Sequence, residues 1–536
     1  MAQARHPVFK YSKFDVAALC NLASEKRGNP SFCDVNQVPT RGGFNWAKLI
    51  RFEDGEECVF RSPVPNHPEL SNEGVARLLE SEAATLLFLE KYTHIPIPTV
   101  YASCSTSDNP IQVPFILMSR AKGKSLAQMW GQENFQFPSH SQSESLNKIM
   151  HQLGCFAWEL SRLRHSQIGS IFLSEGHFAI GECLSRGHMQ YKRHSLRLLP
   201  RGPFSSSDDF LCSLLSAFAG QAHYLPLAKH CFFAPMPVKK DYPSKDMWEY
   251  TNHLWTNFTY LGNKCDSAAN RIDYLIAADA LYDMISQYKS NWEGITTSTE
   301  FALCHPDLSA ENIFVDDDYS ITCIIDWAFT TTVPLPFLLS PPGFPQSRDK
   351  LDEKFCMAFR NGFEDASSGC LTDGSSGLSI PRAIECIQGS EFAWCLSRLL
   401  ALDSIDDLSI FRTLWQIVYP PEKSLESYFF SQRATEKYRR WYRLIDDKHP
   451  SDDQYTQDDI SSFPHDQQYE LSMARHLTMV ADWGINYDMW ICAGLRETGE
   501  TFTTTPQLWR WIMWYRTYQR EQLGKEVVKH RWLPNE

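Results

Sequence analysis

Alternating hydrophobic and polar positions near the start of the chain predict a β-hairpin. Residues 46–52 alternate, Glu53–Glu56 contain an Asp-Gly pair, and residues 57–61 continue the apolar pattern. An Asp-Gly pair between two such runs is typical of a tight hairpin turn. The short apolar run Phe115–Ser119 predicts a further strand. The first part of the chain is therefore expected to be rich in β-strands.

Apolar residues at helical spacing dominate the rest of the chain. Helices are expected at residues 15–26, 72–92, 146–163 and 268–288, and beyond residue 345 as far as 507–525. After about residue 121, one predicted hairpin interrupts this pattern, with strands at residues 313–315 and 321–325. A β-rich unit followed by a larger helical unit indicates the α+β class.

Polar segments between these elements are interpreted as loops. Three are rich in Ser, Pro, Gly and Asp, namely Pro138–Ser145, Pro203–Asp209 and Asp365–Ser379. A fourth, Asp446–His465, is acidic and is expected to be a solvated loop.

The overall composition restricts the kind of partner. Of the 536 residues, 43% are apolar and 21% charged, which is typical of a globular chain. The net charge of −13 makes a broad electrostatic contact with nucleic acid or an anionic membrane unfavourable. No apolar run reaches about 18 residues, so no membrane-spanning helix is predicted. We expect neither nucleic acid nor membrane as a partner.

The N-terminal residues and the cysteines bear on location. Met1–Pro7 lack the apolar core of a secretory signal, which favours the cytoplasm. Arg5, Lys10 and Lys13 leave a short mitochondrial presequence open. The 16 cysteines form no C-x-x-C pair, and we interpret them as reduced, mostly core-packing residues.

The strongest chemical pattern lies in the second predicted hairpin and the loop before it. His305, Asp307 and Asn312 have the spacing H-x-D-x-x-x-x-N, and Asp326 follows two apolar residues and precedes Trp327. The hairpin can return Asp326 to the loop that carries Asp307 and Asn312. Carboxylate and amide oxygens are ligands that Mg²⁺ prefers, and phosphoryl transfer needs a carboxylate near the attacking hydroxyl.

These motifs resemble the aminoglycoside phosphotransferase and choline kinase-like family. More narrowly, the segment is similar to fungal phosphotransferase-family proteins related to the altered-inheritance-of-mitochondria group. The resemblance covers about residues 35–345 and implies a protein-kinase-like two-lobed fold. It further implies an ATP- and Mg²⁺-dependent phosphotransferase that acts on a hydroxyl or amine of a small molecule.

The resemblance also implies roles for individual residues. Asp307 would accept or orient the acceptor proton, Asn312 and Asp326 would hold Mg²⁺, and His305 would shape the loop. The residues expected to bind the nucleotide are Gly42, Gly43, Phe44 and Asn45 in a glycine loop, Arg61 on the third strand, Glu82, and the hinge residues Met118, Ser119, Arg120 and Ala121.

Arg61 and Glu82 are expected to form an ion pair. Glu82 lies among apolar residues on one face of the helix 72–92, where a carboxylate needs a cationic partner. In kinase-like folds the basic residue of the third strand supplies that partner. Here it is Arg where Lys is usual, and the two are not equivalent.

The predicted organisation has four segments. Residues 1–34 are an extension with one helix, 35–120 the N-lobe, 121–345 the C-lobe with the catalytic loop, and 346–536 a helical extension of the C-lobe. Asp326-Trp327-Ala328 replaces D-F-G, no A-P-E follows, and Thr330–Leu335 is interpreted as a short turn. These departures favour a small-molecule acceptor over a protein substrate.

Two functions remain open at this point. The leading one is the small-molecule kinase. The alternative is a catalytically silent kinase-fold protein that binds a ligand or a protein partner. The sequence identifies neither the acceptor nor the oligomeric state.

Overall fold

The computed structural model describes residues 13–130, 140–227, 230, 232, 266–292, 300–347, 349–368, 379–402 and 407–446. The described chain forms two compact units. The first takes in the chain as far as Ala217 together with Lys289–Ser397, and the second contains Phe218–Tyr288 and the described residues from Arg398 onward.

The elements have the following bounds. The strands are β1 (Ser31–Phe32), β2 (Thr40–Arg41), β3 (Asn45–Phe52), β4 (Glu57–Pro63), β5 (Val100–Cys104), β6 (Phe115–Ser119), β7 (Lys124–Ser125), β8 (Arg164–His165), β9 (Ile171–Ser174), β10 (His177–Ile180), β11 (Phe301–Cys304), β12 (Ile313–Val315), β13 (Ile321–Ile324) and β14 (Thr331–Val333). The helices are α1 (Val16–Arg27), α2 (Asn72–Tyr92), α3 (Leu126–Trp130), α4 (His140–Arg162), α5 (Arg186–Met189), α6 (Ser207–Tyr224), α8 (Ala268–Tyr288), α9 (Leu335–Leu338), α10 (Glu353–Ser368), α11 (Ile380–Gln388), α12 (Glu391–Ala401), α13 (Asp407–Val418), α14 (Leu425–Arg433) and α15 (Glu436–Asp446), with 3₁₀ turns η2 (Arg193–Ser195) and η5 (Lys289–Trp292).

An antiparallel sheet near the N-terminal end positions the first part of the site. Its strand order is β1-β3-β4-β6-β5, and β2 pairs with β3. The register places Arg61 opposite Ile116 and Val59 opposite Met118. Because successive side chains of a strand point to opposite faces, these four side chains share one face of the sheet.

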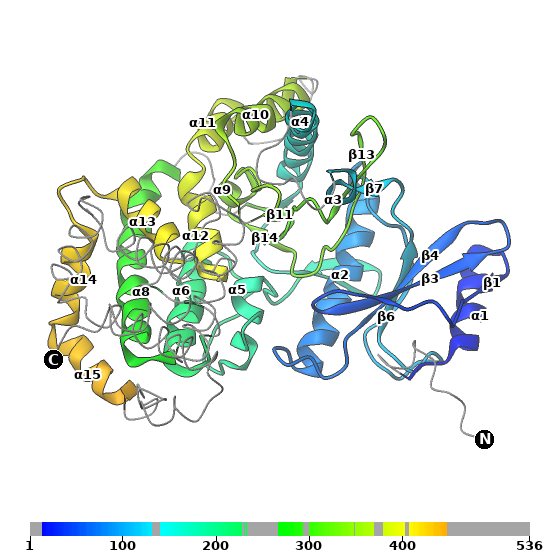
Figure 1. Cartoon of the computed structure of the whole chain (residues 1–536), viewed down its shortest axis with the longest axis horizontal. Coiled ribbons are helices and arrows are strands. Elements are labelled where there is room, and N and C mark those ends of the chain that lie inside the picture. Colours follow the sequence, from blue (N-terminus) through cyan, green and yellow to red (C-terminus); the bar gives the residue numbers. More distant parts are fainter. Residues whose placement is uncertain are drawn as a thin grey trace, which may run out of the picture. The chain divides into compact units, whose positions relative to one another are not determined.

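Helices cover both faces of this sheet (Figure 1). Helix α1 begins at Asp15, whose carboxylate caps the Ala18 N–H, and ends at Gly28 in the left-handed conformation. Its apolar side packs with Trp46, Phe60 and their buried neighbours. Helix α2 begins at Ser71, which caps Gly74, and carries the buried Glu82 toward the face that holds Arg61.

Two three-stranded sheets hold the predicted catalytic loop. Strand β11 lies between β14 and β8, and β12 lies between β13 and β7. The loop of residues 305–312 connects β11 to β12. Strand β13 then returns antiparallel to β12, with Ile313 opposite Ile324, so the residue that follows β13 lies beside the end of the loop.

Two glycines allow α4 and α10 to pack closely in the first unit. A Cβ at Gly154 would lie 1.9 Å from the Phe359 carbonyl oxygen, and one at Gly362 would lie 1.8 Å from the His151 carbonyl oxygen. Each helix therefore requires a glycine where it contacts the backbone of the other.

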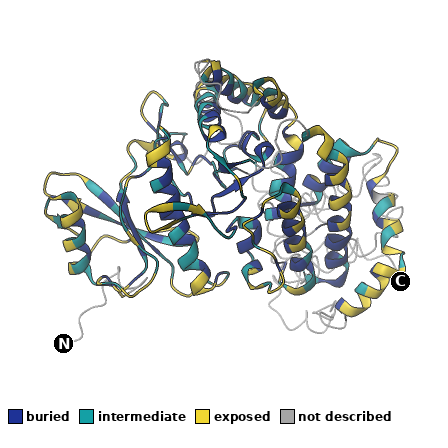
Figure 2. Ribbon diagram, turned by 180° about the vertical axis from the view of Figure 1, so that it is seen from behind, coloured by how far each residue is buried: buried dark blue, intermediate teal, exposed yellow. Residues whose placement is uncertain are grey.

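The second unit is helical and has a polar centre. Asp407 is fully buried, accepts a hydrogen bond from the Tyr274 hydroxyl, and lies 3.0 Å from His230 Nδ1. Arg433 pairs with Asp273 on α8 through two hydrogen bonds of 2.7 Å. Helix α8 is buried along most of its length (Figure 2).

The α+β, protein-kinase-like fold class is confirmed, since a β-sheet region carrying the strand–helix ion pair precedes a mostly helical region with the loop and hairpin. The predicted hairpins and the helices near 15–26, 72–92 and 268–288 are present.

Other predictions about individual elements were wrong. Strands β8, β9, β10 and β11 lie where only helix was expected, and Thr330–Leu335 contains strand β14 rather than a turn. These strands are short and gain their ladder partners from distant residues, so local spacing does not identify them. Helix α4 begins inside the expected loop Pro138–Ser145, α6 inside Pro203–Asp209, and α10 runs into Asp365–Ser379. The predictions for most of Asp446–His465 and for 507–525 lie outside the described residues.

Within the described ranges, no helix combines the length and apolar character needed to cross a membrane. The cysteines in the described ranges are free thiols, and Cys58, Cys183, Cys323, Cys386 and Cys395 are buried.

Candidate active site

A cavity of about 350 Å³ lies against the sheet face that carries Arg61. Its walls come from β3, β4, α2, the end of β6 and the residues after β13. Seven of the residues predicted to bind nucleotide or metal line it: Arg61, Glu82, Met118, Ser119, Arg120, Ala121 and Asp326. The structure therefore brings together residues that lie up to 265 positions apart in the sequence.

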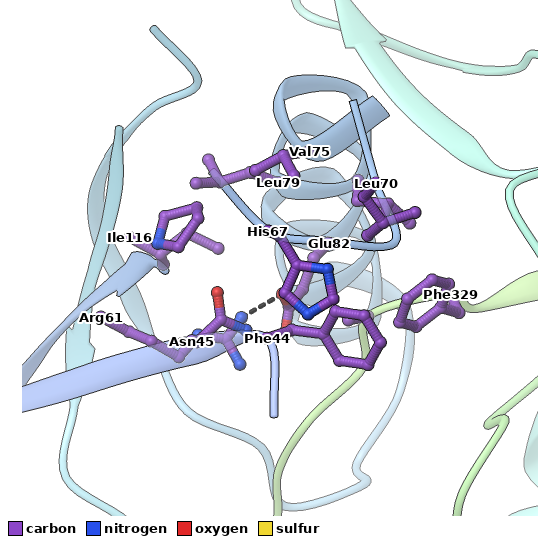
Figure 3. A pocket seen from close by; sticks show the side chains of 13 residues that line it. Phe44, Asn45, Arg61, His67, Leu70, Val75, Leu79, Glu82, Ile116 and Phe329 are labelled. Carbon is purple, nitrogen blue, oxygen red and sulfur yellow. Dashed lines mark ion pairs between the residues drawn. The ribbon is translucent and has the colours of Figure 1, made fainter. Parts of the chain in front are cut away.

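Arg61 connects two carboxylates at the wall of this cavity. It forms an ion pair with Glu82, and its Nη1 lies 3.4 Å from Asp326 Oδ1. The Glu82 side chain is only 5% exposed and that of Arg61 14%. Burial acts to lower the pKa of Arg61, but the carboxylates of Glu82 and Asp326 outweigh it and raise the pKa. The pairing of Arg61 with Glu82 is the one that the sequence predicts (Figure 3).

The predicted catalytic loop is held by His305. Its Nδ1 accepts a hydrogen bond of 3.0 Å from the Asp307 N–H, so Nε2 carries the proton and donates to the Ile325 carbonyl oxygen at 3.1 Å. The ring packs edge-on against Trp327, and burial lowers its pKa to about 4. A neutral imidazole thus ties the loop to the chain just before Asp326.

Asp307 is held on both carboxylate oxygens. Arg186 Nη2 donates to Oδ2 at 2.8 Å, and the Ser347 hydroxyl donates to Oδ1 at 2.5 Å. The carboxylate is 23% exposed. Burial acts to raise the pKa of Asp307, but Arg186 and Ser347 outweigh it and hold the pKa below its usual value.

Asn312 and Asp326 lie side by side at the end of the hairpin. The Ile325 N–H donates to the Asn312 carbonyl oxygen at 3.0 Å, and Asn312 Nδ2 donates to the Asp307 carbonyl oxygen at 2.9 Å. Asp326 has a φ of 65°, in the left-handed region, and its side chain is 42% exposed. Of the two, Asp326 lines the larger cavity and Asn312 does not. One amide oxygen and one carboxylate are of the ligand type that Mg²⁺ takes, since it binds to one or two protein ligands and completes its shell with phosphates and water.

The predicted glycine loop spans the turn between β2 and β3. The Gly42 N–H donates to the Asn45 carbonyl oxygen at 2.8 Å. Neither Gly42 nor Gly43 has a positive φ, and a Cβ at Gly43 would meet no atom within 4 Å. Neither backbone conformation nor internal packing therefore requires a glycine at position 43, and neither Gly42 nor Gly43 is among the residues that line the larger or the smaller cavity.

Phe44 and Asn45 face a second, smaller cavity of about 30 Å³. Figure 3 shows the ring of Phe44 stacked on His67, at 4.6 Å between ring centres, with Phe329 beside it at 5.3 Å. Phe44 therefore attaches the glycine loop to the segment that follows Asp326. Arg61 and Glu82 line both cavities.

The hinge residues line the larger cavity where β6 ends. The Ser119 N–H donates to the Thr99 carbonyl oxygen at 2.9 Å, and Arg120 forms an ion pair with Glu57. These contacts attach the hinge to strands on either side of it.

Sequence reasoning missed Arg186 and Ser347. They lie 121 and 40 positions from Asp307 along the chain. Neither belongs to a motif whose spacing refers to Asp307, so only the folded chain reveals the contact.

No family model matches the chain. It is 38% identical over 100 residues to a subtelomeric hrmA-associated cluster protein of Aspergillus fumigatus, a match that covers 18% of each chain. It is 22% identical over 344 residues to altered inheritance of mitochondria protein 9, mitochondrial, of Eremothecium gossypii, covering 59% of this chain and 52% of that protein. The matches thus span about half or less of these relatives. The second confirms the predicted resemblance to the altered-inheritance-of-mitochondria group.

Solved structures of small-molecule kinases are also similar. Plasmodium vivax ethanolamine kinase matches with a TM-score of 0.35 at 13% identity, covering 72% of this chain and 82% of that one. A macrolide 2′-phosphotransferase of Brachybacterium faecium matches with a TM-score of 0.32 at 12% identity, covering 76% and 99%.

Proposed function

We propose that this protein transfers the γ-phosphoryl group of ATP to a hydroxyl group of a small molecule. One observation carries the proposal. The cavity wall bears the Arg61–Glu82 pair and Asp326, while Asp307 and Asn312 lie on the loop directly beside Asp326. Catalysis of phosphoryl transfer consists mainly of positioning and charge neutralisation, and this set of side chains serves both.

Asp307 is proposed to receive the acceptor's hydrogen bond. Arg186 beside Oδ2 favours a hydroxyl over a protonated amine, since it would repel a second cation.

The nucleotide is proposed to lie in the larger cavity. Its base would lie against the hinge residues Met118–Ala121 and its phosphates near Arg61, under Gly42 and Gly43. Asn312 and Asp326 would hold Mg²⁺, which supplies charge neutralisation on the phosphates when bound. Arg61 would stay fully charged there because two carboxylates face it.

Calorimetric titration of ATP, with and without Mg²⁺, tests the proposal. Wild type is expected to bind ATP only with Mg²⁺, and Asp326→Ala to weaken that binding at least about tenfold, since it removes a metal ligand. The control is Asp317→Ala, an exposed residue in the turn between β12 and β13. Binding that is unaffected by Mg²⁺ and by Asp326→Ala would contradict the metal site.

The catalytically silent alternative rests on two features of the same site. Both oxygens of Asp307 are occupied by side chains of the protein itself, and Arg61 stands where kinases usually have Lys. Folded wild type that binds no ATP under either condition would favour this alternative.

The cellular location is part of the proposal. We propose a mitochondrial location, because the Eremothecium gossypii relative is named as mitochondrial. Fractionation of cells that express the full chain, probed by an antibody to its α14–α15 segment, distinguishes the mitochondria from the cytoplasm.

A further inference from the structure

The strongest feature that the proposed roles leave unexplained is the pair of side chains on Asp307. Arg186 and Ser347 come from two separate segments, yet they meet on one carboxylate. A hydrogen bond to each oxygen fixes the rotation of the carboxylate group. The remaining lone pairs then have defined directions in which to receive an acceptor's hydroxyl.

The segment that carries Arg186 is firmly anchored. Arg186 begins the single turn α5, and the next residue's carbonyl oxygen accepts a hydrogen bond of 2.9 Å from the fully buried Arg193. The buried His188 lies between the hydroxyls of Ser185, at 2.8 Å, and Ser213, at 3.0 Å. Arg186 therefore projects from a turn whose backbone has little freedom to move.

The segment that carries Ser347 folds back on the catalytic loop itself. The Ala310 N–H donates to the Pro345 carbonyl oxygen at 2.9 Å, and the Gly343 N–H donates to the Ser347 carbonyl oxygen at 3.3 Å. A Cβ at Gly343 would lie 1.9 Å from the Asp349 carbonyl oxygen, so this turn needs glycine to close. Ser347 is only 4% exposed. Backbone hydrogen bonds within the segment 343–347 and between it and the loop 305–312 thus hold the Ser347 hydroxyl against Asp307.

We propose that Arg186 and Ser347 are positioning residues for Asp307. The inference rests on the proposed phosphotransferase function and deepens it. It predicts that loss of Arg186 impairs turnover far more than nucleotide binding, because Arg186 donates a hydrogen bond to Asp307 and is not among the residues that line the larger cavity.

The test uses ATP with Mg²⁺ as the probe and water as the phosphoryl acceptor. Two quantities are measured, the Kd of the nucleotide by calorimetry and the rate of ADP release. Arg186→Met should reduce the rate about 100-fold and leave the Kd within about threefold, and Arg186→Lys should restore most of the rate by returning the charge. Ser347→Ala should reduce the rate about tenfold, and Ser347→Thr, which keeps the hydroxyl, should restore it.

Arg77→Met is the matched control. Arg77 also pairs with carboxylates, those of Glu80 and Glu182 at 2.9 Å, but has no contact with Asp307. Its rate and Kd should equal those of wild type. Thermal melting of every variant separates loss of fold from loss of turnover.

Three results would overturn the inference. The first is an Arg186→Met variant that turns over ATP as fast as wild type. The second is a variant that turns over ATP faster, which would make the contact inhibitory. The third is a variant whose nucleotide affinity falls in parallel with its rate. Failure of the proposed function looks different. In that case wild type itself binds no nucleotide or releases no ADP, and the positioning role is rejected with it.

Discussion

Asp307 occupies the position where loop, acceptor and nucleotide are proposed to meet. Its N–H is bonded to His305, its carbonyl oxygen to Asn312, and its carboxylate to Arg186 and Ser347. Every polar group of this residue is thus tied to another part of the site. A substitution that keeps its shape should change the chemistry and leave this network largely in place.

Asp307→Asn is therefore expected to reduce turnover at least about 100-fold while nucleotide Kd stays within a few-fold, since the amide cannot accept a proton. The measurement is ADP release, with calorimetric titration of ATP beside it. Asp317→Asn, in the exposed turn between β12 and β13, is the control. A variant that loses binding together with turnover would show that Asp307 serves binding or folding instead.

The space around the Cα atom differs between two glycines of the first unit. Gly43, in the predicted glycine loop, has open space where a Cβ would be, whereas Gly154 on α4 lies against the backbone of α10. The first should matter to a ligand and the second to the packing of two helices.

The pair of variants Gly43→Ala and Gly154→Ala should therefore give opposite results. Gly43→Ala is expected to leave the melting temperature unchanged and to weaken ATP binding several-fold, because the methyl group enters the space proposed for phosphates. Gly154→Ala is expected to destabilise the fold by about 2 kcal/mol or more, through overpacking. Calorimetry and thermal melting on both variants check the two statements. Unchanged ATP affinity in Gly43→Ala would remove this loop from the nucleotide site.

The elements that could be predicted from sequence are those with strong local signals. The β3–β4 hairpin has its Asp-Gly turn, α2 has its apolar spacing and its Ser71 cap, and the β12–β13 hairpin follows a recognisable motif. Strands β8 and β14 have two and three residues and exist because β11 lies between them. Such strands depend on partners that are distant in the sequence, so no local pattern predicts them.

The same distinction applies to the site. The ion pair of Glu82 with Arg61 can be predicted because a carboxylate on an apolar helix face needs a cationic partner. Arg186 gives no such local signal, because it lies in a segment rich in arginine and lysine. Its partner could be identified only once the chain was folded.

At the scale of the whole molecule, three histidines of the first unit link stability to pH: His188 and His305, which are buried, and His165, which is half-buried. Burial lowers the pKa of His165 to about 4, of His188 to about 3 and of His305 to about 4. In the unfolded chain the pKa of a histidine is about 6.5. Below that pH the unfolded chain takes up protons that the folded chain does not, so stability falls as the solution is acidified.

Urea unfolding measured between about pH 7.5 and about pH 5 checks this dependence. The free energy of unfolding is expected to fall by about 2 kcal/mol per histidine by pH 5. His165→Gln should reduce the loss because it removes one of the three groups. His177→Gln, an exposed position on β10, should not. A urea midpoint that does not change with pH would show that these rings are protonated in the folded state.

The backbone at Asp326 has a genetic consequence. Its φ of 65° is one that aspartate, asparagine and glycine adopt more readily than other residues. Each aspartate codon becomes an asparagine or a glycine codon through a single nucleotide change, and either replacement would keep this backbone while removing the carboxylate. A gene for this fold is therefore one point mutation from a folded chain without that charge, and an allele of this kind would give a chain that is stable in the cell and altered only in its chemistry.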